Sequence, residues 1–109
     1  MIEFSEGIYT FYVYIITNNY RTTFYIGMTN NLGRRLIEHK KDIDNGKKTF
    51  ATKYNLKHLV FYQKFGWVQQ AIAREKELKG WRREKKLDLV REFNPTFRPL
   101  NHIFGQVIE

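Results

Sequence analysis

Two short segments rich in β-branched and aromatic residues, joined by a turn-like stretch, restrict the fold of this chain more than any other feature. Residues 12–16 (YVYII) and 22–27 (TTFYIG) flank residues 17–21, which include two asparagines. Because β-branched and aromatic residues favour strands and asparagine favours turns, this pattern predicts a β-hairpin. A third run of the same kind, residues 58–65, ends at Gly66. The sequence therefore predicts a sheet of about three strands.

Apolar residues at spacings of three, four and seven predict three helices around this sheet. The first covers residues 32–42 with Asn31 available as its N-cap, the second begins near Val68 and is interrupted at Gly80, and the third ends at Asn94-Pro95. The order ββαβαα predicts an α+β fold, a small antiparallel three-stranded sheet flanked by helices. With 109 residues, we expect one domain over residues 1–109 with a core at about residues 12–102.

The charge and the absence of cysteine narrow the function classes. Nineteen Lys and Arg against eleven Asp and Glu give a net charge of +8. So basic a domain favours a polyanion such as nucleic acid, although charge alone is equally consistent with a well-solvated surface. Without cysteine, disulfides, thiolate zinc sites and cysteine nucleophiles are excluded. No apolar run is long enough for a membrane span, so we expect a cytoplasmic protein without a membrane partner.

The tyrosines of the predicted hairpin share one face. Antiparallel pairing of Tyr14 opposite Tyr25 would send Tyr12, Tyr14, Tyr25 and Gly27 to the same side, because alternate residues face alternate sides of a strand. The opposite side would then be aliphatic core. On pattern alone, such a tyrosine cluster is more often ordinary sheet packing than a functional site.

Two polar residues of the first predicted helix point toward the sheet. Arg35 and His39 are four residues apart and therefore lie one above the other. Both fall within roughly 60° of Leu32 around the helix, on or beside its apolar stripe. Taken alone, this pattern favours a hydrogen-bonded, half-buried histidine and an arginine whose head reaches solvent.

Glu75 interrupts the apolar stripe of the second predicted helix. It falls within about 20° of the centre of that stripe, which points its carboxylate at the core. Because a buried charge is costly unless it is paired or bound to a metal, Glu75 needs a partner, either an arginine such as Arg35 or a cation. A structural ion pair and a metal ligand are equally consistent with the sequence.

Basic residues recur along the last two predicted helices. Arg82, Arg83, Lys85 and Lys86 could follow a phosphate backbone. Acidic residues are interspersed among them, so for several of these residues an ordinary helix surface laced with salt bridges is the favoured interpretation.

These pieces, in order, resemble the motifs of the GIY-YIG nuclease family. Residues 12–14 (YVY) occupy the position of the GIY motif, and residues 25–27 (YIG) match the YIG motif. The tyrosine of the second motif, Tyr25, lies eleven residues after Tyr14. Arg35, His39, residues 71–75 (AIARE) and Asn101 continue the resemblance over about residues 12–102. A literal Gly-Ile-Tyr at residues 7–9 lies too far from Tyr25 for the family's spacing. The similarity is greatest to the small, stand-alone bacterial branch of the family.

The resemblance implies a metal-dependent DNA endonuclease that hydrolyses phosphodiester bonds. In the family a tyrosine acts as the base, an arginine steadies the phosphoryl group and a glutamate holds one divalent metal ion. Carried over, Tyr14 or Tyr25 would be the base, Arg35 the clamp, and Glu75 the ligand of a single Mg²⁺ or Mn²⁺. His39 would bond a tyrosine or the phosphate.

The resemblance also suggests nucleic-acid contacts and a pathway. Gly27, Arg34 and Asn101 would lie against the DNA, which could be branched or otherwise structured, and DNA repair is the expected setting. Two alternatives stay open. One is a catalytically weak or inactive nucleic-acid-binding module on the same fold, and the other is a protein-interaction domain.

Overall fold

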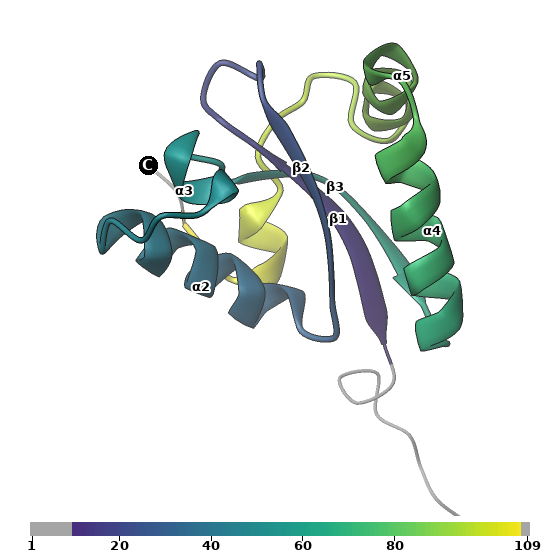
Figure 1. The fold of residues 1–109 in the computed structure, drawn as a ribbon, viewed down its shortest axis with the longest axis horizontal. Coiled ribbons are helices and arrows are strands. Elements are labelled where there is room, and N and C mark those ends of the chain that lie inside the picture. The colour runs from purple at the N-terminus through teal and green to yellow at the C-terminus, as the bar shows by residue number, and fades with distance from the viewer. Residues whose placement is uncertain (1–9, 108–109) are drawn as a thin grey trace, which may run out of the picture.

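The central sheet has three antiparallel strands. A computed structural model of the chain describes residues 10–107, so the Gly-Ile-Tyr at residues 7–9 lies outside the described part. The strands are β1 (Phe11–Thr17), β2 (Phe24–Thr29) and β3 (His58–Phe65), in the spatial order β2-β1-β3. β1 pairs antiparallel with both neighbours, which leaves β2 and β3 at the two edges (Figure 1). The predicted α+β fold with a three-stranded sheet is confirmed.

Helices cover the sheet on both faces. They are α2 (Leu32–Asp44), α3 (Phe50–Lys53), α4 (Val68–Gly80), α5 (Arg83–Phe93) and the 3₁₀ helix η1 (Asn101–Phe104). The three predicted helices are present, and the first continues two residues beyond its predicted end. The sequence pattern missed α3 and η1, because a helix of four residues is too short to show a periodic apolar stripe.

The predicted capping of α2 is present. The side chain of Asn31 accepts a hydrogen bond of 3.0 Å from the backbone N–H of Arg34. This bond satisfies one of the free N–H groups of the first turn and fixes where the helix begins. The start of α2 in turn sets which of its residues face the sheet.

The hairpin register differs from the predicted one by two residues. Tyr14 lies opposite Gly27, and Tyr25 lies opposite Ile16. The side chain of Asn18 accepts hydrogen bonds from the backbone N–H groups of Thr22 and Thr23, which holds both in the loop rather than in the strand. A shift of two residues leaves each side chain on the same face. Tyr14 and Tyr25 therefore share a face as predicted, although they are not opposite each other.

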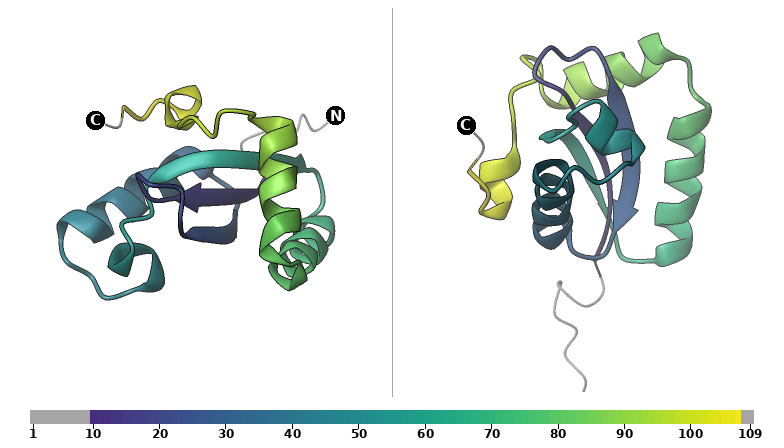
Figure 2. Two further views of the ribbon diagram at one scale, coloured as in Figure 1. Left: turned by 90° about the horizontal axis from the view of Figure 1, so that it is seen from above. Right: turned by 60° about the vertical axis from the view of Figure 1, so that its left-hand side comes forward.

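The sheet separates two apolar clusters. On one face, Ile15 and Val60 pack with Ala71 and Leu78 of α4 and with Val90 of α5. On the tyrosine face a second cluster forms, with these members: Tyr14, Ile16, Leu32, Leu36, Ala51, Leu56, Leu59 and Leu100. Figure 2 shows α4 on one side of the sheet and α2 with η1 on the other. The aliphatic face opposite the tyrosines is present as predicted, and the second cluster, which the sequence pattern did not indicate, is what buries Tyr14.

Candidate active site

Tyr14 and His39 form a buried pair in the tyrosine-face cluster. A hydrogen bond of 3.0 Å joins the Tyr14 hydroxyl to Nε2 of His39, and the two residues are only 1% and 5% exposed. Tyr14 comes from the middle of the central strand and His39 from the sheet-facing side of α2. The helical spacing of the sequence predicts this inward orientation of His39.

Both members of the pair are uncharged at neutral pH. Burial raises the pKa of Tyr14 to about 12, while the neighbouring Arg35 guanidinium acts in the opposite direction. Burial, and then the positive charge of Arg35, lower the pKa of His39 to about 4. A neutral imidazole has one nitrogen that accepts a hydrogen bond. The pair therefore consists of a protonated phenol and a neutral imidazole, and the tautomer of the imidazole sets which of the two donates the hydrogen bond.

Gly27 provides the space that the Tyr14 ring occupies. A Cβ atom at position 27 would lie 2.5 Å from both Cζ and Oη of Tyr14, well inside van der Waals contact. Gly27 is buried opposite Tyr14 in the β1–β2 ladder. The glycine therefore supports the tyrosine from within the sheet, and its expected contact with nucleic acid stays a prediction.

We expect Gly27→Ala to displace the Tyr14 ring and to destabilise the protein. Forcing one methyl group into a packed site typically costs about 1 to 3 kcal/mol. Urea unfolding monitored by circular dichroism measures this loss. Gly66→Ala is the matched control, because a Cβ at position 66 meets nothing within 4 Å. Equal stability of the two variants would contradict the assigned role of Gly27.

Arg35 and Arg34 are neighbours with different surroundings. The Arg35 side chain lies beside the Tyr14 hydroxyl, and its Nη1 donates to Oε1 of Glu38 at 3.2 Å. Arg34 is more exposed, at 64% of its side chain, and contacts the same carboxylate at 3.9 Å. Arg35 is therefore the arginine placed to act together with Tyr14, and Arg34 is directed to the surface.

Glu75 reaches the site from α4. Its side chain is 22% exposed, and its Oε2 lies 3.4 Å from Nζ of Lys79 one turn further along the helix. Burial is the main cause of the raised pKa of Tyr14, and the negative charge of Glu75 adds a smaller effect in the same direction. The sequence offered Arg35 as an ionic partner for Glu75, but the structure pairs Arg35 with Glu38 instead.

Lys79 is a site residue that the sequence interpretation missed. Besides its contact with Glu75, its Nζ lies 6.0 Å from the centre of the Tyr25 ring. The spacing of four residues from Glu75 on a predicted helix was the available signal.

Tyr25 lies at the edge of the sheet, next to the Tyr14–His39 pair. Its ring centre is 6.1 Å from that of His39 and 6.3 Å from that of Phe50 in α3. Because β2 is an edge strand, the half-buried Tyr25 borders both the buried pair and the surface beyond β2. The structure thus brings Tyr14, Tyr25, Arg35, His39 and Glu75 into one region, from two strands and two helices.

Asn101 holds the fold together from within. It is 1% exposed; its Oδ1 accepts from the backbone N–H of Leu59, and its Nδ2 donates to the carbonyl of Lys57 and to Oε1 of Gln106, each at 2.9 Å. These bonds use the polar groups of the side chain inside the protein. Its position does not suit the expected contact with nucleic acid, and we assign it a structural role.

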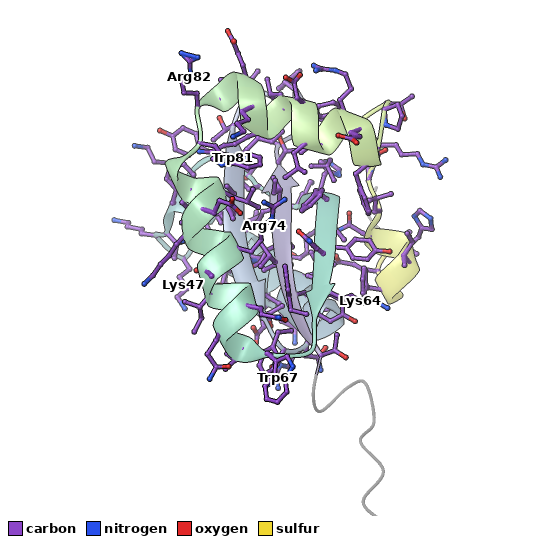
Figure 3. All side chains as sticks on the ribbon, turned by 90° about the vertical axis from the view of Figure 1, so that its right-hand side faces the viewer. Lys47, Lys64, Trp67, Arg74, Trp81 and Arg82 are labelled. Carbon is purple, nitrogen blue, oxygen red and sulfur yellow. The ribbon has the colours of Figure 1, made fainter. Side chains whose placement is uncertain are left out.

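The four basic residues at the α4–α5 junction point in different directions. Arg82 extends away from the helices, as Figure 3 shows. Arg83 donates to the carbonyl of Thr22 at 2.8 Å, and Nζ of Lys85 lies 4.2 Å from the centre of the Trp81 ring. Lys86 is half-buried. They form no single stripe, so only part of the group can face one ligand.

We expect the protein to lose stability in acid because of its buried histidines. Burial lowers the pKa of His58, like that of His39, to about 4, and nearby Arg21 and Lys57 add to the effect. Unfolded histidine has a pKa near 6.5, so between about pH 6.5 and 4 the unfolded chain binds more protons. Stability is then full above about pH 6.5 and falls as the pH decreases.

The urea midpoint at about pH 7 and pH 4.5 measures this dependence. His39→Gln and His58→Gln should each show a smaller drop between the two pH values than the wild type. An unchanged drop in both variants would show that other groups cause the acid sensitivity.

The three-stranded sheet, with two tyrosines on one face and an arginine and histidine on the helix against them, defines a GIY-YIG type of catalytic domain. The family model described as the GIY-YIG catalytic domain matches residues 10–88. The chain belongs to this family.

A solved structure supports the fold. A UPF0213 protein from Bacillus halodurans, determined by solution NMR, is 23% identical, with a TM-score of 0.53. The match covers 91% of this chain and 99% of that one. At this identity the likeness concerns the fold alone. No curated protein matches the chain significantly.

None of the helices within residues 10–107 combines the length and apolar character that a bilayer-spanning helix requires.

Proposed function

We propose that the protein is a metal-dependent endonuclease that hydrolyses phosphodiester bonds in DNA. The observation that carries the proposal is the buried hydrogen bond between Tyr14 and the neutral His39, with the Arg35 guanidinium beside the same hydroxyl. Hydrolysis of a phosphodiester needs an activated water and positive charge near the phosphoryl oxygens. These three residues offer both.

Tyr14 acts as the general base in this proposal. In its tyrosinate form it takes a proton from the attacking water, with its hydroxyl oxygen held in place by the hydrogen bond to Nε2 of His39. Burial disfavours that tyrosinate, and the positive charge of Arg35 favours it. Arg35 stabilises the developing charge on the phosphoryl oxygens, and it also favours the tyrosinate.

The residues present fit one magnesium or manganese ion held by Glu75. The carboxylate is half-buried at the site, and residues 10–107 contain no group of three or more Asp, Glu, His or Cys that would form an all-protein cage. Mg²⁺ commonly binds through one or two carboxylates and keeps several waters. When bound, such an ion supplies positive charge for the leaving oxygen. Lys79 balances the charge of Glu75 in the free protein.

A nucleic-acid-binding module without useful turnover is the second candidate. The net charge of +8 and the surface arginines and lysines favour it independently of the tyrosine pair. Arg34, Arg82 and the basic residues of α5 would then carry the affinity through phosphate contacts alone.

Incubation of the purified protein with a panel of DNA substrates separates the two candidates. The panel contains single strands, nicked and intact duplexes, flaps and four-way junctions, each with Mg²⁺, Mn²⁺ or a chelator. We expect metal-dependent cleavage of at least one substrate. Intact DNA throughout, together with binding that weakens steeply as salt rises, would establish the binding module instead.

A further inference from the structure

A cleft of about 380 Å³ lies between β2 and the junction of α4 with α5. Its apolar wall includes Phe24 and Ile26 from the edge strand and Leu87 and Val90 from α5. A volume of this size lies within the range of small-molecule sites in proteins. We call it the β2 cleft.

All the charged residues that line the β2 cleft are positive. Lys79, Arg83 and Lys86 contribute to its lining, which contains no carboxylate. Arg83 is held in place by its bond to the carbonyl of Thr22, and its guanidinium lies 5.3 Å from the centre of the Phe24 ring. An apolar interior with cationic groups suits a ligand that joins a flat apolar part to a negative charge.

The β2 cleft is continuous with the candidate active site. Tyr25 lines the cleft and also packs against His39, which bonds Tyr14. Lys79 lines the cleft and also contacts Glu75. A group bound in the cleft would therefore lie next to a phosphodiester held by the site residues.

We propose that the β2 cleft binds the base of one unstacked nucleotide, adjacent to the phosphodiester bond at the site. This inference rests on the proposed function. The base would pack against the aromatic side chains that line the cleft, Phe24 on one face of β2 and Tyr25 with Phe50 on the other, as unstacked bases do on aromatic side chains. The neighbouring phosphate would face Lys79 and Lys86.

Binding of an unstacked base in the β2 cleft would restrict which DNA can be a substrate. A base within an intact duplex cannot enter the cleft without leaving its stack, and unstacking costs least where the base is already unpaired. The substrate class is therefore DNA that offers an unpaired nucleotide next to the cleaved bond, in a single strand, a bulge or a flap.

Binding of a short oligonucleotide tests the cleft without cleavage. Nitrogen-15-labelled Glu75→Gln protein is titrated with a single-stranded thymidine hexanucleotide and with the same sugar-phosphate backbone lacking bases. We expect amide shifts concentrated in residues 24–26 and 83–90, and affinity at least about tenfold higher for the strand with bases. Equal affinity of the two strands would overturn the proposal.

Two pairs of variants locate the effect. Leu87→Trp fills the cleft and should abolish the difference in affinity between the strand with bases and the strand without them. If the amide spectrum shows that this variant does not fold, Leu87→Phe is used in its place. Lys86→Glu should weaken binding more than Lys64→Glu, which makes the same charge change on β3, at the opposite edge of the sheet (Figure 3). Equal effects of the two lysine variants, or none of Leu87→Trp, would show that only general charge attracts the strand.

The outcomes distinguish this inference from the proposed function. If the cleft binds the strand with bases more tightly but the wild type cleaves no DNA, the β2 cleft is a base-binding site and the proposed endonuclease activity is wrong. If the wild type and Leu87→Trp cleave fully paired DNA at the same rate, the protein is an endonuclease but the β2 cleft does not bind a base.

Discussion

Replacement of Tyr14 by phenylalanine should lower the rate of DNA cleavage by about 10²-fold to 10⁴-fold, the usual contribution of a positioned general base. The variant keeps the ring that fills the space beside Gly27 and removes only the hydroxyl that bonds His39. We therefore expect a folded protein that still binds DNA. Single-turnover cleavage at saturating protein measures the chemical step separately from binding.

Tyr62→Phe is the control for this substitution. Tyr62 lies opposite Tyr14 on β3 and packs in the same cluster, with its ring against Phe93 and Phe104. It should cleave at nearly the wild-type rate. If Tyr14→Phe also kept that rate, Tyr14 would not be the base, and Tyr25 would become the candidate.

Arg35→Ala should lower the cleavage rate by about 10²-fold to 10³-fold, as does the loss of one group that stabilises a developing oxyanion. The guanidinium lies beside the Tyr14 hydroxyl, so its removal also takes away the positive charge that lowers the pKa of that tyrosine. The loss should therefore fall on kcat rather than on DNA affinity.

The adjacent Arg34 gives a matched comparison. Arg34→Ala removes the same charge from the exposed side of α2. It should weaken DNA binding modestly and reduce the slope of affinity against salt by about one, with little change in kcat. Similar kinetic losses in both variants would mean that Arg35 contributes only general positive charge.

Local patterns in the sequence predicted much of the fold. The β-branched runs located all three strands, and the apolar stripes located α2, α4 and α5. The hairpin register was wrong by two residues because it depends on the hydrogen bonds of one loop side chain, that of Asn18. The second apolar cluster was missed because it is assembled from segments that are far apart in the chain, such as Ile16, Leu56 and Leu100.

The sequence predicted which residues belong to the candidate site, but it predicted few of the contacts between them. Helical spacing turned His39 inward, but no spacing rule reveals that its partner is Tyr14, 25 residues earlier. The same rule places Lys79 beside Glu75 on one helix, but it could not show that Arg35 pairs with Glu38 instead of Glu75, because that depends on how α2 and α4 pack around the sheet. Asn101 carries side-chain groups that suit either a phosphate or a backbone, and only its burial decides between them.

The measurement that tests the central claim most directly compares metal-dependent DNA cleavage by the wild type, Glu75→Gln and Glu77→Gln. Glu77 is the control because it lies on the same helix and contacts Arg74 on the exposed surface. We expect Mg²⁺-dependent cleavage by the wild type and Glu77→Gln, and at least about 10³-fold slower cleavage by a folded Glu75→Gln, a loss of several kcal/mol. Cleavage by Glu75→Gln at the wild-type rate, or no cleavage by the wild type with either metal, would contradict the account.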